Sequence, residues 1–197
     1  MPLITTLAGA SARGYGGLLA SGAAPAFESI ASVTVGINGA ADITFSSIPS
    51  TYQHLQIRGI ARSEEAASGI ATLRMQINAQ TGTIYNQHYM TGNGTTLTAG
   101  NSPSISYAIA AYGAPKDNAL ASTYGALIID IFDYKSTNKY KTIRGLSGVD
   151  FNGSGNIDFN SNSFMSTDAI TSIKLYFNVY AFKRYSHIAL YGIKGVA

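Results

Sequence analysis

The chain has 197 residues, a formal net charge of +3, no cysteine, and charged side chains at only 12% of its positions. The absence of cysteine excludes disulfides, thiol catalysis and cysteine-ligated zinc. The charged fraction is well below the roughly 25% of an ordinary soluble domain, and the longest basic run is the pair Lys183 and Arg184. Nucleic-acid binding is therefore not expected, because phosphate contacts require a basic stripe.

The first 26 residues differ in composition from the rest of the chain. Arg13 is their only charged side chain, and five glycines oppose a stable helix at about 1 kcal/mol each relative to alanine. We expect residues 1–26 to be an N-terminal docking arm that orders against a neighbouring protein, and residues 27–197 to form the body. The alternative is a solvated terminus, which has no need of apolar side chains. The residues expected to carry docking are Leu3, Ile4, Leu7, Arg13, Gly14, Tyr15, Gly16 and Leu18.

The arm is not expected to act as a secretory signal, because its positive charge follows the apolar residues instead of preceding them. No segment approaches the roughly 18 consecutive apolar residues of a membrane-spanning helix. We therefore expect no membrane insertion.

Beyond residue 26 the apolar residues alternate with polar ones or form short runs, and turn residues separate these segments. Asn38 and Gly39 predict a hairpin between the first two strands. The segment 124–132 is the most apolar, and we expect it at the centre of a sheet. The predicted strands are 32–37, 42–45, 54–60, 72–78, 83–90, 104–110, 124–132, 139–146, 156–159, 170–180 and 187–193.

This pattern predicts an all-β fold. Many short strands with long connections favour a jelly-roll-like antiparallel β-sandwich, preceded by the extended N-terminal arm. No fixed internal period is present, so neither a propeller nor a solenoid is expected.

Residues suited to catalysis or metal binding are scarce. His54, His88 and His187 lie far apart and belong to no metal-ligand motif. No G-x-S-x-G nucleophile motif occurs, and the glycine-rich segments precede no helix that would hold phosphate. We therefore expect no catalytic residues, no metal and no cofactor, and a protein that is not an enzyme.

Tyrosine is abundant, with thirteen residues, whereas tryptophan is absent. Tyrosine rings are common on binding surfaces, and Tyr85, Tyr89, Tyr107 and Tyr112 are candidates for a glycan-binding patch. The alternative is that these residues fill half-buried strand faces, which tyrosine also favours.

Several segments of the body resemble structural proteins of tailed bacteriophages. They are residues 45–58 (FSSIPSTYQHLQIR), 130–144 (DIFDYKSTNKYKTIR), 146–148 (LSG) and 188–193 (IALYGI). The segment 10–16 (ASARGYG) also resembles the leading peptide of phage appendage proteins.

The resemblance implies a virion component assembled in the host cytoplasm. It favours an appendage such as a tail fibre, spike or collar fibre, which associates as a homotrimer and binds other virion proteins through residues 1–26. A head decoration protein is the first alternative. A carbohydrate-binding module that recognises a host surface glycan is the second, and it is compatible with the appendage role.

Overall fold

The computed structural model describes residues 26–195, which form twelve β-strands and no helix, so this part of the chain contains no helix able to cross a membrane. The strands are β1 (Phe27–Thr34), β2 (Asp42–Phe45), β3 (His54–Ala61), β4 (Ile70–Ile77), β5 (Tyr85–Gly92), β6 (Leu97–Ile105), β7 (Ala108–Pro115), β8 (Gly125–Ile131), β9 (Lys141–Asp150), β10 (Gly155–Phe164), β11 (Ile173–Tyr176) and β12 (His187–Ile193).

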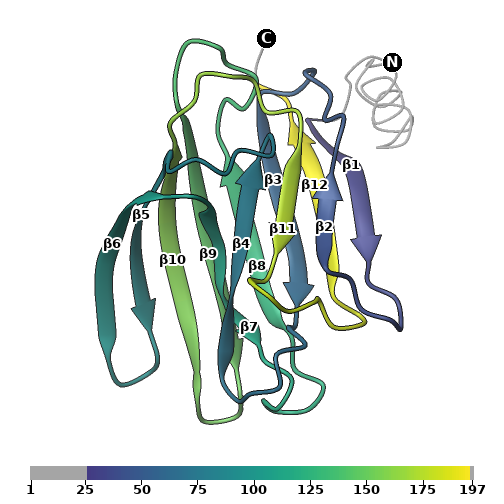
Figure 1. The fold of residues 1–197 in the computed structure, drawn as a ribbon, viewed down its shortest axis with the longest axis vertical. Coiled ribbons are helices and arrows are strands. Elements are labelled where there is room, and N and C mark those ends of the chain that lie inside the picture. The colour runs from purple at the N-terminus through teal and green to yellow at the C-terminus, as the bar shows by residue number, and fades with distance from the viewer. Residues whose placement is uncertain (1–25, 196–197) are drawn as a thin grey trace, which may run out of the picture.

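Two antiparallel sheets pack face to face (Figure 1). The larger has the order β1-β12-β3-β8-β9-β10-β5-β6, and the smaller has the order β2-β11-β4-β7. If the hairpins β5–β6 and β9–β10 are set aside, eight strands remain in the orders 1-8-3-6 and 2-7-4-5. This is the strand order of a jelly roll. The two extra hairpins pair with each other through β10 and β5, and they widen one sheet only.

Apolar and polar side chains alternate along many of the strands, and the apolar ones face the space between the two sheets, where they form the core. On β4, Leu73, Met75 and Ile77 are fully buried, as their shared face predicts. The apolar segment around Ile129 becomes β8, which lies between β3 and β9 inside the larger sheet, so its predicted central position is confirmed. Leu55 and Ile57 of β3 also face inward, as expected.

The hairpin predicted at Asn38 and Gly39 is wrong. Gly39 has a positive φ of 70°, as a turn glycine does, but β1 pairs with β12 and β2 pairs with β11. The chain crosses from one sheet to the other at this turn, which is how a jelly roll connects its layers.

One strand was not expected at all. No strand is predicted between residues 90 and 104, yet this region forms most of β6, and the strand predicted at 104–110 begins at Ala108. β6 is the edge of the larger sheet, and most of its residues are exposed. Small and polar residues, with Pro103 among them, suit such an edge although they give no apolar alternation.

The segments 45–58 and 130–144 pack on one another. Gln56 Nε2 donates a hydrogen bond to Asp130 Oδ1 at 2.6 Å, between paired positions of β3 and β8. The Tyr134 hydroxyl donates to the carbonyl of Pro49 and accepts from the backbone N–H of Tyr52 at 3.4 Å. These contacts fasten the corner after β8 to the corner before β3, so the residues of both segments support the sandwich itself.

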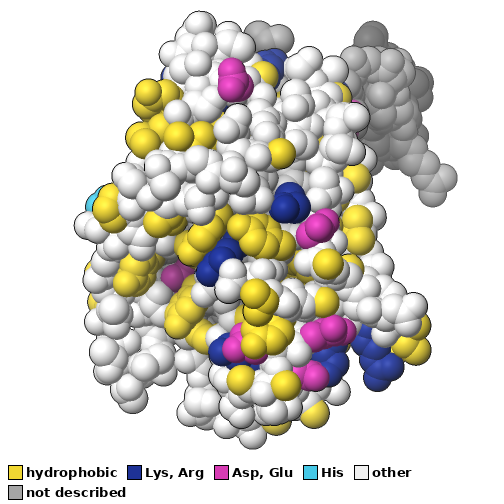
Figure 2. Space-filling view, in the orientation of Figure 1, with side chains coloured by type: hydrophobic (Ala, Val, Ile, Leu, Met, Phe, Trp, Pro, Cys, Tyr) yellow, Lys and Arg dark blue, Asp and Glu magenta, His cyan; other side chains and the backbone are white. Residues whose placement is uncertain are grey.

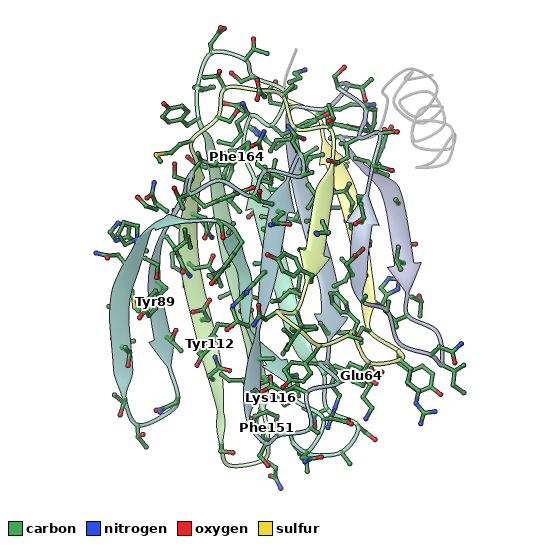
Figure 3. All side chains as sticks on the ribbon, in the orientation of Figure 1. Glu64, Tyr89, Tyr112, Lys116, Phe151 and Phe164 are labelled. Carbon is green, nitrogen blue, oxygen red and sulfur yellow. The ribbon has the colours of Figure 1, made fainter. Side chains whose placement is uncertain are left out.

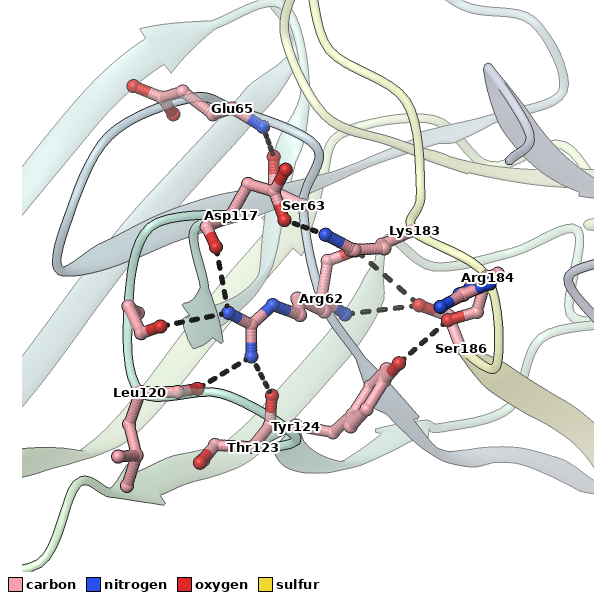
Figure 4. Close-up of polar contacts among 11 residues, drawn as sticks. Arg62, Ser63, Glu65, Asp117, Leu120, Thr123, Tyr124, Lys183, Arg184 and Ser186 are labelled. Carbon is pink, nitrogen blue, oxygen red and sulfur yellow. Dashed lines mark hydrogen bonds and ion pairs between the residues drawn. The ribbon is translucent and has the colours of Figure 1, made fainter. Parts of the chain in front are cut away.

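Two buried cations hold the loops at the ends of the sandwich. The guanidinium of Arg62 donates to the carbonyls of Leu120 and Thr123, both at 2.8 Å, and to those of Asp117 and Ala119 (Figure 4). It thereby fixes the connection between β7 and β8. At the opposite end, Lys141 makes equivalent bonds.

The ammonium of Lys141 donates to the carbonyls of Ser136 at 2.6 Å and Thr167 at 2.9 Å. Burial lowers the pKa of Lys141, and the charge of nearby Asp168 opposes this shift. Backbone carbonyls here satisfy a charge that would otherwise be costly to bury.

Candidate functional site

A groove forms where the larger sheet extends beyond the smaller one. The four-stranded sheet ends at β7, which packs against β10, and β5 and β6 extend beyond this edge (Figure 1). The space-filling view shows a hollow between the β5–β6 hairpin and the edge of the small sheet (Figure 2). Its volume is about 510 Å³. It is lined by Ile70, Thr72, Gln87, Tyr89, Thr91, Asn93, Thr96, Thr98, Ile109, Tyr112, Gly155, Asn156 and Asp158.

The strand β7 is brought close to β8 and β9 by glycines. A Cβ atom on Gly125 would collide with the carbonyl oxygen of Gly113, and one on Gly113 would lie 3.1 Å from the Cα of Gly148. The layers therefore meet almost backbone to backbone at this end. This close approach sets the wall of the groove directly against its floor.

A ladder of buried polar side chains runs along the inward face of β10. Asn162 Nδ2 donates to Asn160 Oδ1, and Asn160 Nδ2 donates to Asp158 Oδ2, both at 2.8 Å. Each of the three residues is only 1% exposed. The ladder ends at Asp158, whose carboxylate lines the groove.

The direction of the ladder is fixed at its other end. Asn162 accepts a hydrogen bond from the backbone N–H of Ile109 at 3.1 Å and donates one to its carbonyl at 3.0 Å. These bonds determine which atom of Asn162 faces Asn160, so the last position must present an acceptor. A carboxylate at position 158 meets that requirement.

Asp158 is a buried carboxylate without a cationic partner among the residues that line the groove. Burial raises the pKa of Asp158, and the hydrogen bonds from Asn160 and Thr91 oppose the increase. The Thr91 hydroxyl donates to Oδ1 at 2.8 Å. With Oδ2 accepting from Asn160, the carboxylate holds one donor on each oxygen beneath the surface of the groove.

Tyr89 and Tyr112 supply the aromatic surface of the groove, from β5 and β7 respectively (Figure 3). Tyr89 lies over Gly100, its cross-strand partner, where a Cβ atom would approach the tyrosine hydroxyl to 2.7 Å. Tyr112 is 38% exposed. Its side chain is therefore available to a ligand.

The backbone of Tyr112 is held by side chains of the larger sheet. Its N–H donates to Ser147 Oγ at 3.0 Å, and its carbonyl accepts from Asn156 Nδ2 at 2.5 Å. The remaining amide atom, Asn156 Oδ1, is buried and has no partner within residues 26–195. A buried acceptor without a partner is uncommon in folded proteins, and this one belongs to a residue that lines the groove.

This set of residues suits a sugar. A pyranose presents apolar C–H faces to aromatic rings and hydroxyls to amides, carboxylates and threonines. Among the described residues, Asp158 is the only carboxylate in the lining, whereas glycoside hydrolysis uses two carboxylates. The groove therefore has the groups for recognition and lacks the pair for that reaction.

Two of the four tyrosines predicted for a glycan patch meet in the groove, and two lie elsewhere. Tyr85 is fully buried, packs on Phe164 and donates to the carbonyl of Ile77 at 3.4 Å, and burial raises its pKa to about 12. The guanidinium carbon of Arg74 lies over the ring of Tyr107, 4.2 Å from the centre of that ring.

Asn156 and Asp158, which line the groove, were not predicted as site residues from the sequence. A signal was present, because Asn156, Asp158, Asn160 and Asn162 occupy every second position of one segment.

The predicted docking residues between Leu3 and Leu18 lie outside the described residues. Within residues 26–195 no three His, Asp or Glu side chains are grouped to hold a metal.

No family model, no curated protein and no solved structure matches the chain.

Proposed function

We propose that the chain is a non-enzymatic structural component of a tailed phage particle, most simply an appendage. Residues 1–26 attach it to other virion proteins, the jelly-roll body associates as a homotrimer, and the groove binds a glycan of the host surface. The first part of this proposal is supported by the body segments that resemble phage structural proteins and by the jelly-roll topology.

The observation that carries the glycan-binding part is the convergence of Tyr89 and Tyr112 with the buried carboxylate of Asp158. Aromatic faces provide contact area at little entropic cost, and the polar groups fix the orientation of a sugar. The β7 edge beside them is occupied by the side chains of Asn162 and Asn156, so it does not act as a free strand-pairing edge.

Deletion of residues 1–26 from the gene in the phage tests the attachment. The body should fold, because residues 26–195 form two paired sheets around a buried core of their own. Particles made with the deleted chain should lack it, whereas full-length chain is incorporated. Normal incorporation of the deleted chain would exclude the arm as the attachment.

The position of the full-length chain in cryo-electron microscopy maps of the particle separates the two virion roles. Density at the tail or collar agrees with an appendage. Density across neighbouring capsid subunits would instead identify a head decoration protein.

A further inference from the structure

The outer face of the larger sheet, opposite the core, carries an apolar stripe. Ile128, Leu146, Phe159 and Met90 are successive cross-strand partners on β8, β9, β10 and β5. A second row beside it contains Ile60, Ala126, Gly148, Ile157, Gly92 and Leu97. We call these two rows the outer stripe.

The outer stripe is continuous and accessible in the described part of the chain. The exposed fractions of its large side chains range from 39% for Ile128 to 69% for Leu97. Single exposed apolar residues need no explanation, but contiguous rows over six strands mark an interaction surface.

A shallow trough deepens the outer stripe at one end. It has a volume of about 670 Å³, and Ile128, Leu146 and Ile157 stand beside the glycines at positions 92 and 148. Asp150 is the only charged residue that lines it, and Asp150 forms no ion pair with any residue between 26 and 195. The trough therefore suits an apolar segment that carries one positive charge.

We propose that the outer stripe is covered by the chain's own residues 13–26, with Arg13 paired to Asp150 and with Tyr15, Leu18 and Leu19 packed on the apolar rows. The charges are complementary, because Arg13 is the only charged side chain among residues 1–26. This inference does not rest on the virion role, and it confines the attachment proposed above to residues 1–12.

The distances permit this path. Asp150 lies four strands away from Phe27 across the larger sheet and eight residue positions away along the strand direction. Together these two displacements give a distance of about 33 Å. The fourteen steps from Phe27 back to Arg13 reach about 46 Å when extended. A tethered segment also has an effective concentration on the order of millimolar, which favours the chain's own segment over that of a neighbour.

Limited trypsin digestion of the full-length chain tests the contact, since Arg13 is the only trypsin site before Arg58. The measured quantity is the rate at which residues 1–13 are lost, followed by intact mass. Cleavage after Arg13 should be about tenfold slower in the wild type than in Ile157→Asp or Asp150→Asn, because proteolysis follows the population of the open form.

The matched control is Val179→Asp, which places the same charge at a 76% exposed apolar residue outside the outer stripe, and it should cleave at the wild-type rate. Ile157 is itself 61% exposed, so its variant should retain the wild-type near-UV spectrum. Equal cleavage of the wild type and both stripe variants would overturn the proposal. Protection that increases with protein concentration would overturn it too, because the covering segment would then come from a neighbouring copy.

Discussion

Asn162 on β10 hydrogen-bonds to both backbone groups of Ile109 on β7, accepting from its N–H at 3.1 Å and donating to its carbonyl at 3.0 Å. A side chain of one sheet thus occupies the place that a neighbouring strand would take at the edge of the other sheet. The same amide orients the polar ladder that ends at Asp158. The geometry of the groove and the protection of the β7 edge therefore depend on one residue.

Replacement of Asn162 by alanine should lower the free energy of unfolding by about 2–4 kcal/mol, because it leaves buried polar groups of Ile109 and Asn160 without partners. Urea denaturation measures this change. Ser161→Ala, on the exposed face of the same strand, should change stability by less than about 0.5 kcal/mol. Similar effects of the two substitutions would contradict the role given to Asn162.

Arg62→Met should destabilise the protein by about 2–4 kcal/mol, because it removes the charged donor that satisfies four loop carbonyls. Amide hydrogen exchange should become faster in the connection between β7 and β8. The exposed Arg184→Met is the matched control, and its stability should stay within about 0.5 kcal/mol of the wild type. An unchanged exchange rate in Arg62→Met would show that the loop holds without the guanidinium.

The raised pKa of Asp158 predicts a dependence of stability on pH. Between the pKa of this carboxyl in the unfolded chain and its higher pKa in the folded chain, the folded state binds more protons. The contribution of Asp158 to stability therefore falls as the pH rises through this window and remains constant above it.

Asp158→Asn should remove this contribution. The asparagine can accept from Asn160 with Oδ1 and donate to the Thr91 hydroxyl with Nδ2, so both contacts persist. Denaturation midpoints measured across the acid range should decline less with increasing pH in the variant than in the wild type. Parallel curves for the two proteins would mean that Asp158 ionises in the fold as it does in the unfolded chain.

The elements with apolar alternation could be predicted from the sequence, and those without it could not. The strand at 42–45 and the strand at 187–193 have the predicted limits, because apolar positions and turn residues define both. β6 was missed because an exposed edge strand has no core to impose a pattern on its side chains. The pairing of β1 with β12 was missed for another reason: it joins the two ends of the body, and local turn residues carry no information about such long-range partners.

Of the residues that carry the candidate site, only Tyr89 and Tyr112 could be predicted from the sequence. Tyr89 and Tyr112 are conspicuous by residue type, but nothing local separates them from Tyr85, which the core buries. Asp158 was overlooked because polar residues at alternate positions are normally read as the solvent face of a strand. On β10 the pattern is inverted, with Phe159 outside and Asp158 inside, since the second sheet ends at β7 and leaves a polar groove to be lined.

Glycan binding by the full-length chain tests the central claim most directly. The wild type should bind a subset of bacterial surface glycans on an array, and Tyr112→Ala should weaken that binding about tenfold, or about 1.4 kcal/mol. Tyr112→Phe should retain most of the affinity because it preserves the stacking ring. Tyr140→Ala, at a 58% exposed tyrosine outside the groove, should bind like the wild type. A wild-type chain that binds no glycan, or a Tyr112→Ala variant that binds as well as the wild type, would contradict the account.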